Sequence, residues 1–163
     1  MDETEAARRL AEDVRKFNNH LTTGFVGTPY LCHTLSSNGY LDVAYDLLNQ
    51  DSYPSWLYPV TMGATTIWER WDGQKPDMSF QNPGMNSFNH YSFGAIGQWM
   101  MANSLGIQRD EPGFQKFILR PEPDPTGEMT WAEGWYDSMY GRIYSRWDQG
   151  GEHLVYEAKV PAN

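Results

Sequence analysis

The chain has 163 residues, a length that suits one ordinary domain or parts of two. Its 12 lysine and arginine residues are outnumbered by 21 aspartate and glutamate residues, which gives a net charge of −9. Nucleic acids and anionic membranes both attract basic proteins, so this charge opposes a nucleic-acid partner and a membrane partner.

No segment points to export or to a disulfide framework. None approaches the roughly 18 unbroken apolar residues of a membrane span, and the first residues lack the basic and apolar regions of a signal peptide. The one cysteine, Cys32, lies in an apolar run, which predicts that it packs as a small hydrophobic residue. We expect a soluble chain, and no targeting signal assigns it to a compartment.

Helical periodicity dominates the first half of the chain. Apolar residues recur about once per turn up to Phe17, with Thr4 placed as an N-cap before them. Thr28 followed by Pro29 predicts a second helix start, and Gly39 supplies the left-handed residue that ends that helix. We therefore predict helices over residues 5–17, 29–37 and 40–48.

A fourth and longer helix is predicted from Asn86 to Gly106. Its apolar residues lie on more than one side, and a helix that is apolar all round is buried between neighbours. Short helical hairpins with such inner helices suit a toroid of helix pairs. The two apolar sets are Tyr91, Ala95 and Trp99 on one side and Phe93, Ile96 and Met100 on another.

The hydrophobic period changes near residues 110–113, where strand-like runs begin. Turn-forming residues separate these runs, including a proline-rich stretch at 121–125 and the pair Gly150–Gly151, which is typical of a hairpin. The predicted strands cover residues 116–119, 130–136, 141–147 and 153–160. The chain is thus predicted to be mainly α with a β tail.

The sequence Trp68-Glu69-Arg70-Trp71 places a carboxylate between two tryptophans. Aromatic rings offer flat apolar faces with a polar edge, a surface that suits a sugar ring. The alternative is structural: Glu69 and Arg70 form an ion pair on the rim of an aromatic core. No Gly-x-Ser-x-Gly, His-Glu-x-x-His or phosphate-binding glycine motif occurs, and the four histidines lack metal-ligand spacing. We therefore expect no metal and no cofactor.

Five strings, in order and across most of the chain, resemble the C-terminal part of bacterial α-L-rhamnosidases, glycoside hydrolase family 78. The resemblance implies part of an (α/α)6 toroid over residues 1–110, followed by an incomplete antiparallel β-sandwich over residues 111–163. The strings are Thr23–Leu31 (TGFVGTPYL), Tyr53–Val60 (YPSWLYPV), Gly63–Trp71 (GATTIWERW), Asn86–Gly94 (NSFNHYSFG) and Phe117–Pro121 (FILRP).

The resemblance also implies an inverting glycosidase that removes terminal α-L-rhamnose from glycosides or polysaccharides. In the family the general acid lies upstream, in an acidic Asp-Glu-Arg-type motif, and no Asp-Glu-Arg string occurs in this sequence. Glycoside hydrolysis uses two carboxyl groups. The resemblance therefore implies half of an active site, and we expect the 163 residues alone to be inactive.

Individual roles follow from the same resemblance. Glu69 matches the general base, and His90 matches a residue that contacts the bound rhamnose. Of Trp68 and Trp71, one is expected to line the sugar pocket and the other to pack in the core. A structural alternative remains for His90, since a lone histidine among aromatic residues is often a hydrogen-bonded core residue.

Two other interpretations of the whole chain remain open. One is a non-catalytic carbohydrate-binding or interaction module derived from the same barrel, and the other is an (α/α)6 glycosidase with different sugar specificity. In each case the expected partner is a carbohydrate, and for the rhamnosidase it is a carbohydrate that contains rhamnose. Incomplete domains leave apolar faces uncovered, so we also expect self-association or contact with the missing part of the enzyme.

Overall fold

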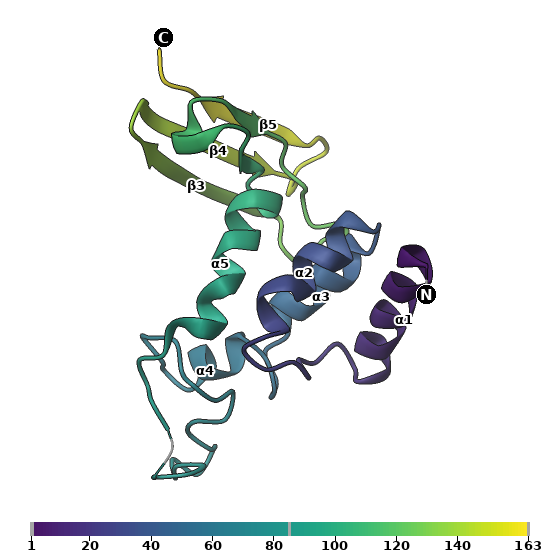
Figure 1. Ribbon diagram of the computed structural model, residues 1–163, viewed down its shortest axis with the longest axis vertical. Helices are drawn as coiled ribbons and strands as arrows, with labels where there is room; N and C mark the ends of the chain where they lie inside the picture. The colour runs from purple at the N-terminus through teal and green to yellow at the C-terminus, as the bar shows by residue number, and fades with distance from the viewer. Residues whose placement is uncertain (1, 85, 163) are drawn as a thin grey trace. The chain divides into compact units, whose positions relative to one another are not determined.

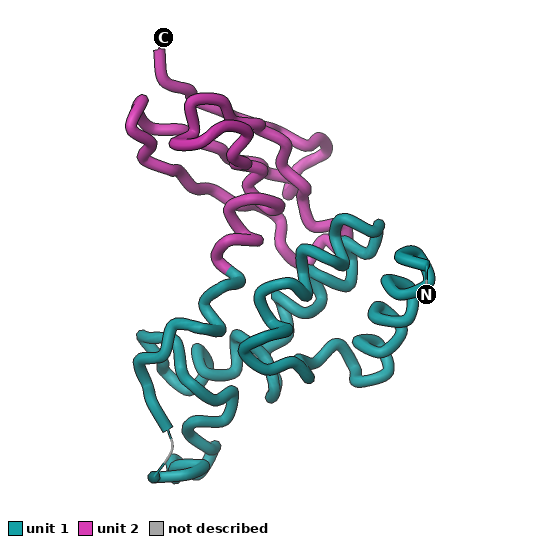
Figure 2. The backbone as a smooth tube through the Cα atoms, in the orientation of Figure 1, with its two compact units in different colours: residues 1–96 teal, residues 97–163 magenta. Residues whose placement is uncertain are grey.

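The computed structural model describes residues 2–84 and 86–162 (Figure 1). The chain divides into two compact units, residues 1–96 and residues 97–163 (Figure 2). The first unit is helical and carries long loops, whereas the second contains antiparallel β-sheets. Among the residues that the structure describes, no helix combines the length and the apolar character that a bilayer crossing needs.

The three helices predicted in the first unit are confirmed, although their first residues differ from the prediction. Asp2, not Thr4, is the N-cap of the first helix, and Gly27, not Thr28, precedes the second. The Thr28 hydroxyl donates to the carbonyl oxygen of Gly24 at 2.9 Å, so it ties the helix to the preceding loop. The helices are α1 (Glu3–Lys16), α2 (Thr28–Ser37), α3 (Leu41–Asn49) and a short α4 (Leu57–Thr61).

The core of the first unit forms where α2 packs against α3 (Figure 1). Leu35 of α2 is fully buried, and so are the apolar residues on one side of α3. Each fully buried aliphatic side chain contributes about 1.5–3 kcal/mol through the hydrophobic effect. The buried residues of α3 are Val43, Ala44, Tyr45, Leu47 and Leu48.

The single long helix predicted from Asn86 to Gly106 is wrong. Residues 86–90 are not helical, and the rest divides into a 3-10 helix (Tyr91–Ala95), α5 (Ile96–Trp99) and a π-helical turn (Met100–Ser104). The indole N–H of Trp56 donates to the carbonyl oxygen of Phe93 at 2.9 Å. This long-range bond uses an acceptor that a continuous α-helix would need for itself.

The predicted burial of that segment on all sides is also wrong. Phe93 and Trp99 are buried, but the side chain of Tyr91 is 87% exposed and that of Met100 is 41% exposed. The glycine at position 94 brings the backbone close to the Ile67 side chain, where a Cβ atom would lie 3.2 Å away. One face of the segment therefore packs closely, and the other remains open to solvent.

Over its described residues, 97–162, the second unit holds two antiparallel sheets, and the predicted strands are confirmed with shifted ends. Strand β1 (Ile107–Arg109), which was not predicted, pairs with β2 (Phe117–Leu119), and a 3-10 turn (Pro112–Phe114) lies between them. The three-stranded sheet has the order β3 (Trp131–Ser138), β4 (Gly141–Asp148) and β5 (Val155–Lys159).

The core of the second unit lies on one face of β4. Leu105, Ile107 and Ile143 form a buried apolar cluster. Trp147 is fully buried, and its indole N–H donates to the carbonyl oxygen of Ser104 at 2.8 Å, so the buried polar group is satisfied.

Candidate active site in the helical unit

Hydrogen bonds join two segments of the first unit that are distant in sequence. The N–H of Glu69 donates to the carbonyl oxygen of Ser87 at 2.8 Å, and the N–H of His90 donates to the carbonyl oxygen of Ile67 at 2.8 Å. The two candidate polar site residues thus lie on adjoining segments, in a register that the backbone sets.

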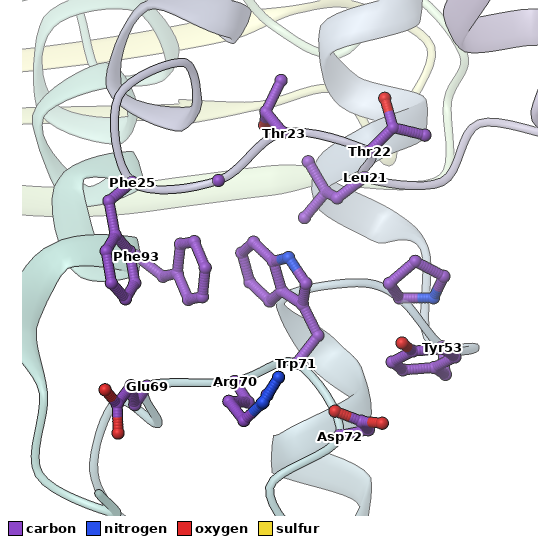
Figure 3. Close-up of a pocket in the computed structure, with 12 residues that line it drawn as sticks. Leu21, Thr22, Thr23, Phe25, Tyr53, Glu69, Arg70, Trp71, Asp72 and Phe93 are labelled. Atoms are coloured by element: carbon purple, nitrogen blue, oxygen red, sulfur yellow. The ribbon is translucent and has the colours of Figure 1, made fainter. Parts of the chain in front are cut away.

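A cavity of about 450 Å³ opens beside this pairing (Figure 3). The volume falls within the range of roughly 300–1,000 Å³ that is typical of small-molecule sites. Its wall combines aromatic rings with two carboxylates and a guanidinium group. The lining residues are Leu21, Thr22, Thr23, Gly24, Phe25, Tyr53, Pro54, Glu69, Arg70, Trp71, Asp72 and Phe93.

Glu69 lines this cavity and is held by the main chain. Its Oε2 accepts a hydrogen bond of 2.8 Å from the N–H of Ser87, and its side chain is partly exposed. Within the described residues it forms no ion pair with Arg70, which Figure 3 shows between the carboxylates of Glu69 and Asp72. One oxygen is therefore fixed by the main chain, and Glu69 still lines the cavity.

His90 touches the cavity wall through an aromatic neighbour. Its ring stacks on Phe25, with centroids 4.7 Å apart and planes at 12°, and Phe25 lines the cavity. His90 itself is not one of the lining residues. Its Nδ1 atom is buried and has no hydrogen-bond partner among the described residues. This atom is enclosed by protein, so it does not itself face a ligand in this structure.

The two tryptophans occupy different environments. Trp71 lines the cavity and stacks on Phe93, with centroids 3.7 Å apart and planes at 17°. Trp68 is buried against the edge of Phe88, at 5.0 Å between centroids, and lines a second, smaller cavity of about 280 Å³. Of these two tryptophans, Trp71 is therefore the one that lines the same cavity as Glu69.

Asp72 was not singled out from the sequence, and Tyr53 was assigned no role, although both line the cavity. Burial raises the pKa of the Tyr53 hydroxyl, and the negative charge of Asp72 raises it further. Arg70 acts in the opposite direction on the same group. A sequence signal for Asp72 was present, because it directly follows Trp71 in the motif that carries Glu69.

Family models match both parts of the chain. Residues 1–104 match the bacterial alpha-L-rhamnosidase 6 hairpin glycosidase domain, and residues 106–163 match the bacterial alpha-L-rhamnosidase C-terminal domain. The first match alone covers more than half of the chain.

Named relatives agree with these models. An alpha-L-rhamnosidase of Streptomyces avermitilis is 46% identical over 158 residues, and one of Formosa agariphila is 40% identical over 158 residues. Each alignment covers 97% of this chain but only 15% and 17% of the respective relative. The chain therefore spans about a sixth of the length of the curated relatives it matches.

Solved structures have the same fold over this region. The S. avermitilis alpha-L-rhamnosidase, crystallised in complex with L-rhamnose, matches with a TM-score of 0.90 and 45% identity over 97% of this chain and 15% of its own. The Aspergillus terreus enzyme matches with a TM-score of 0.90 and 38% identity over 97% of this chain and 18% of its own. Together with the family models, these matches show that the chain belongs to the bacterial α-L-rhamnosidase family, with a six-hairpin glycosidase segment followed by a C-terminal domain segment.

Proposed function

We propose that the chain is part of an inverting glycosidase that removes terminal α-L-rhamnose from glycosides or polysaccharides. The observation that carries the proposal is Glu69, whose carboxylate is held by the main chain and which lines a cavity with aromatic rings, in a chain of this family. Glycoside hydrolysis requires carboxyl groups, and aromatic faces offer a surface that suits a sugar ring.

Glu69 acts as the general base in this proposal. A water molecule beside its carboxylate loses a proton to it and forms a bond to the anomeric carbon, on the face opposite the leaving group. The bond from the anomeric carbon to the glycosidic oxygen breaks, and that oxygen takes a proton from the general acid. Inverting enzymes hold the two carboxyl groups roughly 6.5–9.5 Å apart to leave room for the water.

The general acid comes from outside these 163 residues. A single carboxylate cannot protonate the leaving oxygen and accept a proton from water on opposite faces of the sugar. The purified chain alone is therefore expected not to hydrolyse an aryl rhamnoside. Turnover by the chain, lost in a Glu69→Gln variant, would show that it carries its own acid.

The other site residues bind the sugar. The imidazole ring of His90, which stacks on the cavity residue Phe25, supplies a polar contact to a rhamnose hydroxyl group in this proposal, and the indole ring of Trp71 offers a face at the cavity wall. Trp68 is the more remote candidate and would act through the smaller cavity that it lines. The proposed ligand is a rhamnose-containing carbohydrate, as in the S. avermitilis complex.

For the architecture, we propose that residues 1–110 supply helices of an (α/α)6 toroid. Residues 111–163 begin an antiparallel β-sandwich, of which the three-stranded sheet is one layer. The remainder of the parent enzyme covers the apolar surfaces that this chain leaves exposed. Limited proteolysis of the intact protein, with the cleavage sites mapped by mass spectrometry, tests the proposed domain boundary between residues 110 and 111.

The test uses the intact protein that contains this chain and a p-nitrophenyl α-L-rhamnoside. The Glu69→Gln variant should lose turnover by orders of magnitude at nearly unchanged KM, because base catalysis acts on the transition state. Glu128→Gln, at an exposed carboxylate of the second unit, is the matched control. NMR of the first-formed sugar should show the anomer of inverted configuration.

Each alternative predicts a different result in the same assay. A non-catalytic module would bind rhamnose with no turnover. A glycosidase of other specificity would prefer another member of a panel of aryl glycosides. Near-normal activity of Glu69→Gln would remove Glu69 from the role of base.

A further inference from the structure

The cavity beside Glu69 contains polar groups that the proposed catalytic step does not use. Asp72, Arg70 and Tyr53 line its wall beyond the catalytic carboxylate, and Figure 3 shows Arg70 between Glu69 on one side and Asp72 with Tyr53 on the other. These three side chains provide a carboxylate acceptor, a planar cationic donor, and a hydroxyl group that both donates and accepts.

None of the three is committed to a partner within the protein. In the part of the chain that the structure describes, the side chains of Asp72, Arg70 and Tyr53 form no hydrogen bond and no ion pair. By contrast, the exposed Asp77 accepts bonds from the N–H and the hydroxyl group of Ser79. A carboxylate and a guanidinium that line one cavity without a mutual ion pair are both free to bind a ligand.

The electrostatic setting keeps the Tyr53 hydroxyl group protonated. Burial and the charge of Asp72 both raise its pKa, and only Arg70 opposes them. The hydroxyl group can therefore donate a hydrogen bond at neutral pH and accept another. Trp71 adds an apolar surface next to these groups, with its opposite side held against Phe93.

We propose that Asp72, Arg70 and Tyr53 bind adjacent hydroxyl groups of the sugar whose anomeric carbon faces Glu69, and so determine which sugar the cavity accepts. Asp72 accepts from one hydroxyl group, and Arg70 donates to its neighbour. This inference rests on the proposed glycosidase function and names the part of the site that recognises the sugar ring.

The charges and the cavity both favour this assignment. Sugar hydroxyl groups are neutral and each one donates and accepts, so a paired acceptor and donor matches two of them without leaving a buried charge unpaired. A site built to hydrogen-bond a hydroxyl group rejects the analogue that lacks it, because its polar groups then remain unpaired.

The experiment compares the intact wild-type protein with Asp72→Asn and with Tyr53→Phe. Substrates are p-nitrophenyl α-L-rhamnoside and its 2-, 3- and 4-monodeoxy analogues. The wild type should lose about ten- to hundredfold in kcat/KM on the analogue that lacks the hydroxyl group bound by Asp72. Asp72→Asn should show a similar loss of kcat/KM on the parent substrate. Its kcat/KM on that deoxy analogue should be only a little lower than its kcat/KM on the parent substrate.

Asp51→Asn is the matched control, since Asp51 is an exposed aspartate near Tyr53 that does not line the cavity. It should behave as the wild type with all four substrates. Tyr53→Phe gives an independent test that removes one oxygen and no charge. If Asp72→Asn does not fold, the same dependence on a single hydroxyl group in Tyr53→Phe still supports the proposal.

Three results would overturn the inference. The first is an equal loss on every analogue, which marks a structural role. The second is a larger loss with an alkyl than with a nitrophenyl leaving group, which marks a general acid. The third is a defect confined to disaccharides, which places the bound hydroxyl groups on a second sugar ring.

A failure of the proposed function remains distinguishable from a failure of this inference. If the wild-type protein does not hydrolyse rhamnosides, calorimetric titration with L-rhamnose replaces the kinetic assay. Asp72→Asn should then weaken L-rhamnose binding by about tenfold or more, and Asp51→Asn should not. Unchanged binding in Asp72→Asn would reject the proposed role of Asp72.

Discussion

Glu69 and Ser87 exchange two hydrogen bonds. The main-chain N–H of Ser87 donates to Oε2 of Glu69, the N–H of Glu69 donates to the carbonyl oxygen of Ser87, and both distances are 2.8 Å. The direction of the candidate base is therefore set by a backbone group and not by the neighbouring guanidinium of Arg70. Main-chain donors cannot change rotamer, so they hold a side chain more rigidly than another side chain can.

This relationship predicts opposite results for two substitutions at position 87. Ser87→Ala keeps the N–H and should retain activity, whereas Ser87→Pro removes the N–H that binds Oε2 of Glu69. A hydrogen bond to a charged group is worth about 1.5–3 kcal/mol. We expect Ser87→Pro to lower kcat by about ten- to hundredfold in the intact enzyme, with a smaller change in KM. Equal losses in the two variants would contradict the role of the N–H.

Two substitutions at His90 should separate the effect of its ring stacking from the effect of its polar contacts. His90→Phe keeps a ring against Phe25 but removes both ring nitrogens, and with them any hydrogen bond from the ring to a sugar hydroxyl group. We expect KM for an aryl rhamnoside to rise about tenfold, at an almost unchanged melting temperature. His90→Ala should additionally lower the melting temperature, because the ring contact is lost. A normal KM in His90→Phe would return His90 to the structural interpretation.

The local parts of the fold were accessible from sequence, and the long-range parts were not. The helices α1 to α3 and strands β2 to β5 follow from patterns within a few residues of each other. The segment from 86 to 106 has an equally apolar pattern but does not form one helix. Its backbone bonds to Glu69 and Trp56, far away in the sequence, and no local pattern signals such partners.

The same distinction applies to the candidate site. Glu69, Trp71 and Asp72 lie within one short motif, yet only the structure reveals that Tyr53 and Phe25 complete the same wall. Sequence motifs therefore predict the site residues that lie close together in the chain, but not those that a distant loop contributes. The exposed surface of Tyr91 also escaped prediction, because an apolar residue on a helix face is normally assigned to the interior.

The substitution Gly106→Ala should destabilise the second unit locally. A Cβ atom there would lie 2.1 Å from the backbone of Arg120, and its φ of +70° is unfavourable for other residues. Gly127 has a similar φ of +79° but no atom within 4 Å of the added Cβ, so Gly127→Ala is the matched control. The left-handed backbone alone costs about 1–2 kcal/mol, and the clash adds about 1–3 kcal/mol.

Hydrogen exchange of the β1 and β2 amides, followed by mass spectrometry, measures this difference. Gly106→Ala should accelerate exchange there far more than Gly127→Ala does, because Gly106 lies next to β1 and its carbonyl oxygen accepts from the N–H of Arg120. Similar exchange in both variants would mean that the backbone moves aside at little cost.

The exposed apolar surface predicts that the isolated 163-residue chain associates with itself. Val26 of the first unit is 86% exposed, and β5, an edge strand of the three-stranded sheet, leaves Val155 61% exposed. Apolar patches and open strand edges on one chain mark an interface or an aggregation hazard. Light scattering should therefore give a mass above that of the monomer, rising with concentration.

A charge placed at Val26 tests whether burial of this apolar side chain drives the association. Val26→Glu should lower the average mass, because a carboxylate resists removal from water unless it is paired. Gln115→Glu adds the same charge at an exposed polar position of the second unit and should leave the mass unchanged. If the remaining part of the enzyme covers the same surface, its addition should compete with self-association. A well-folded monomer over a wide concentration range would exclude this account, and the exposed side chains would then tolerate water without a partner.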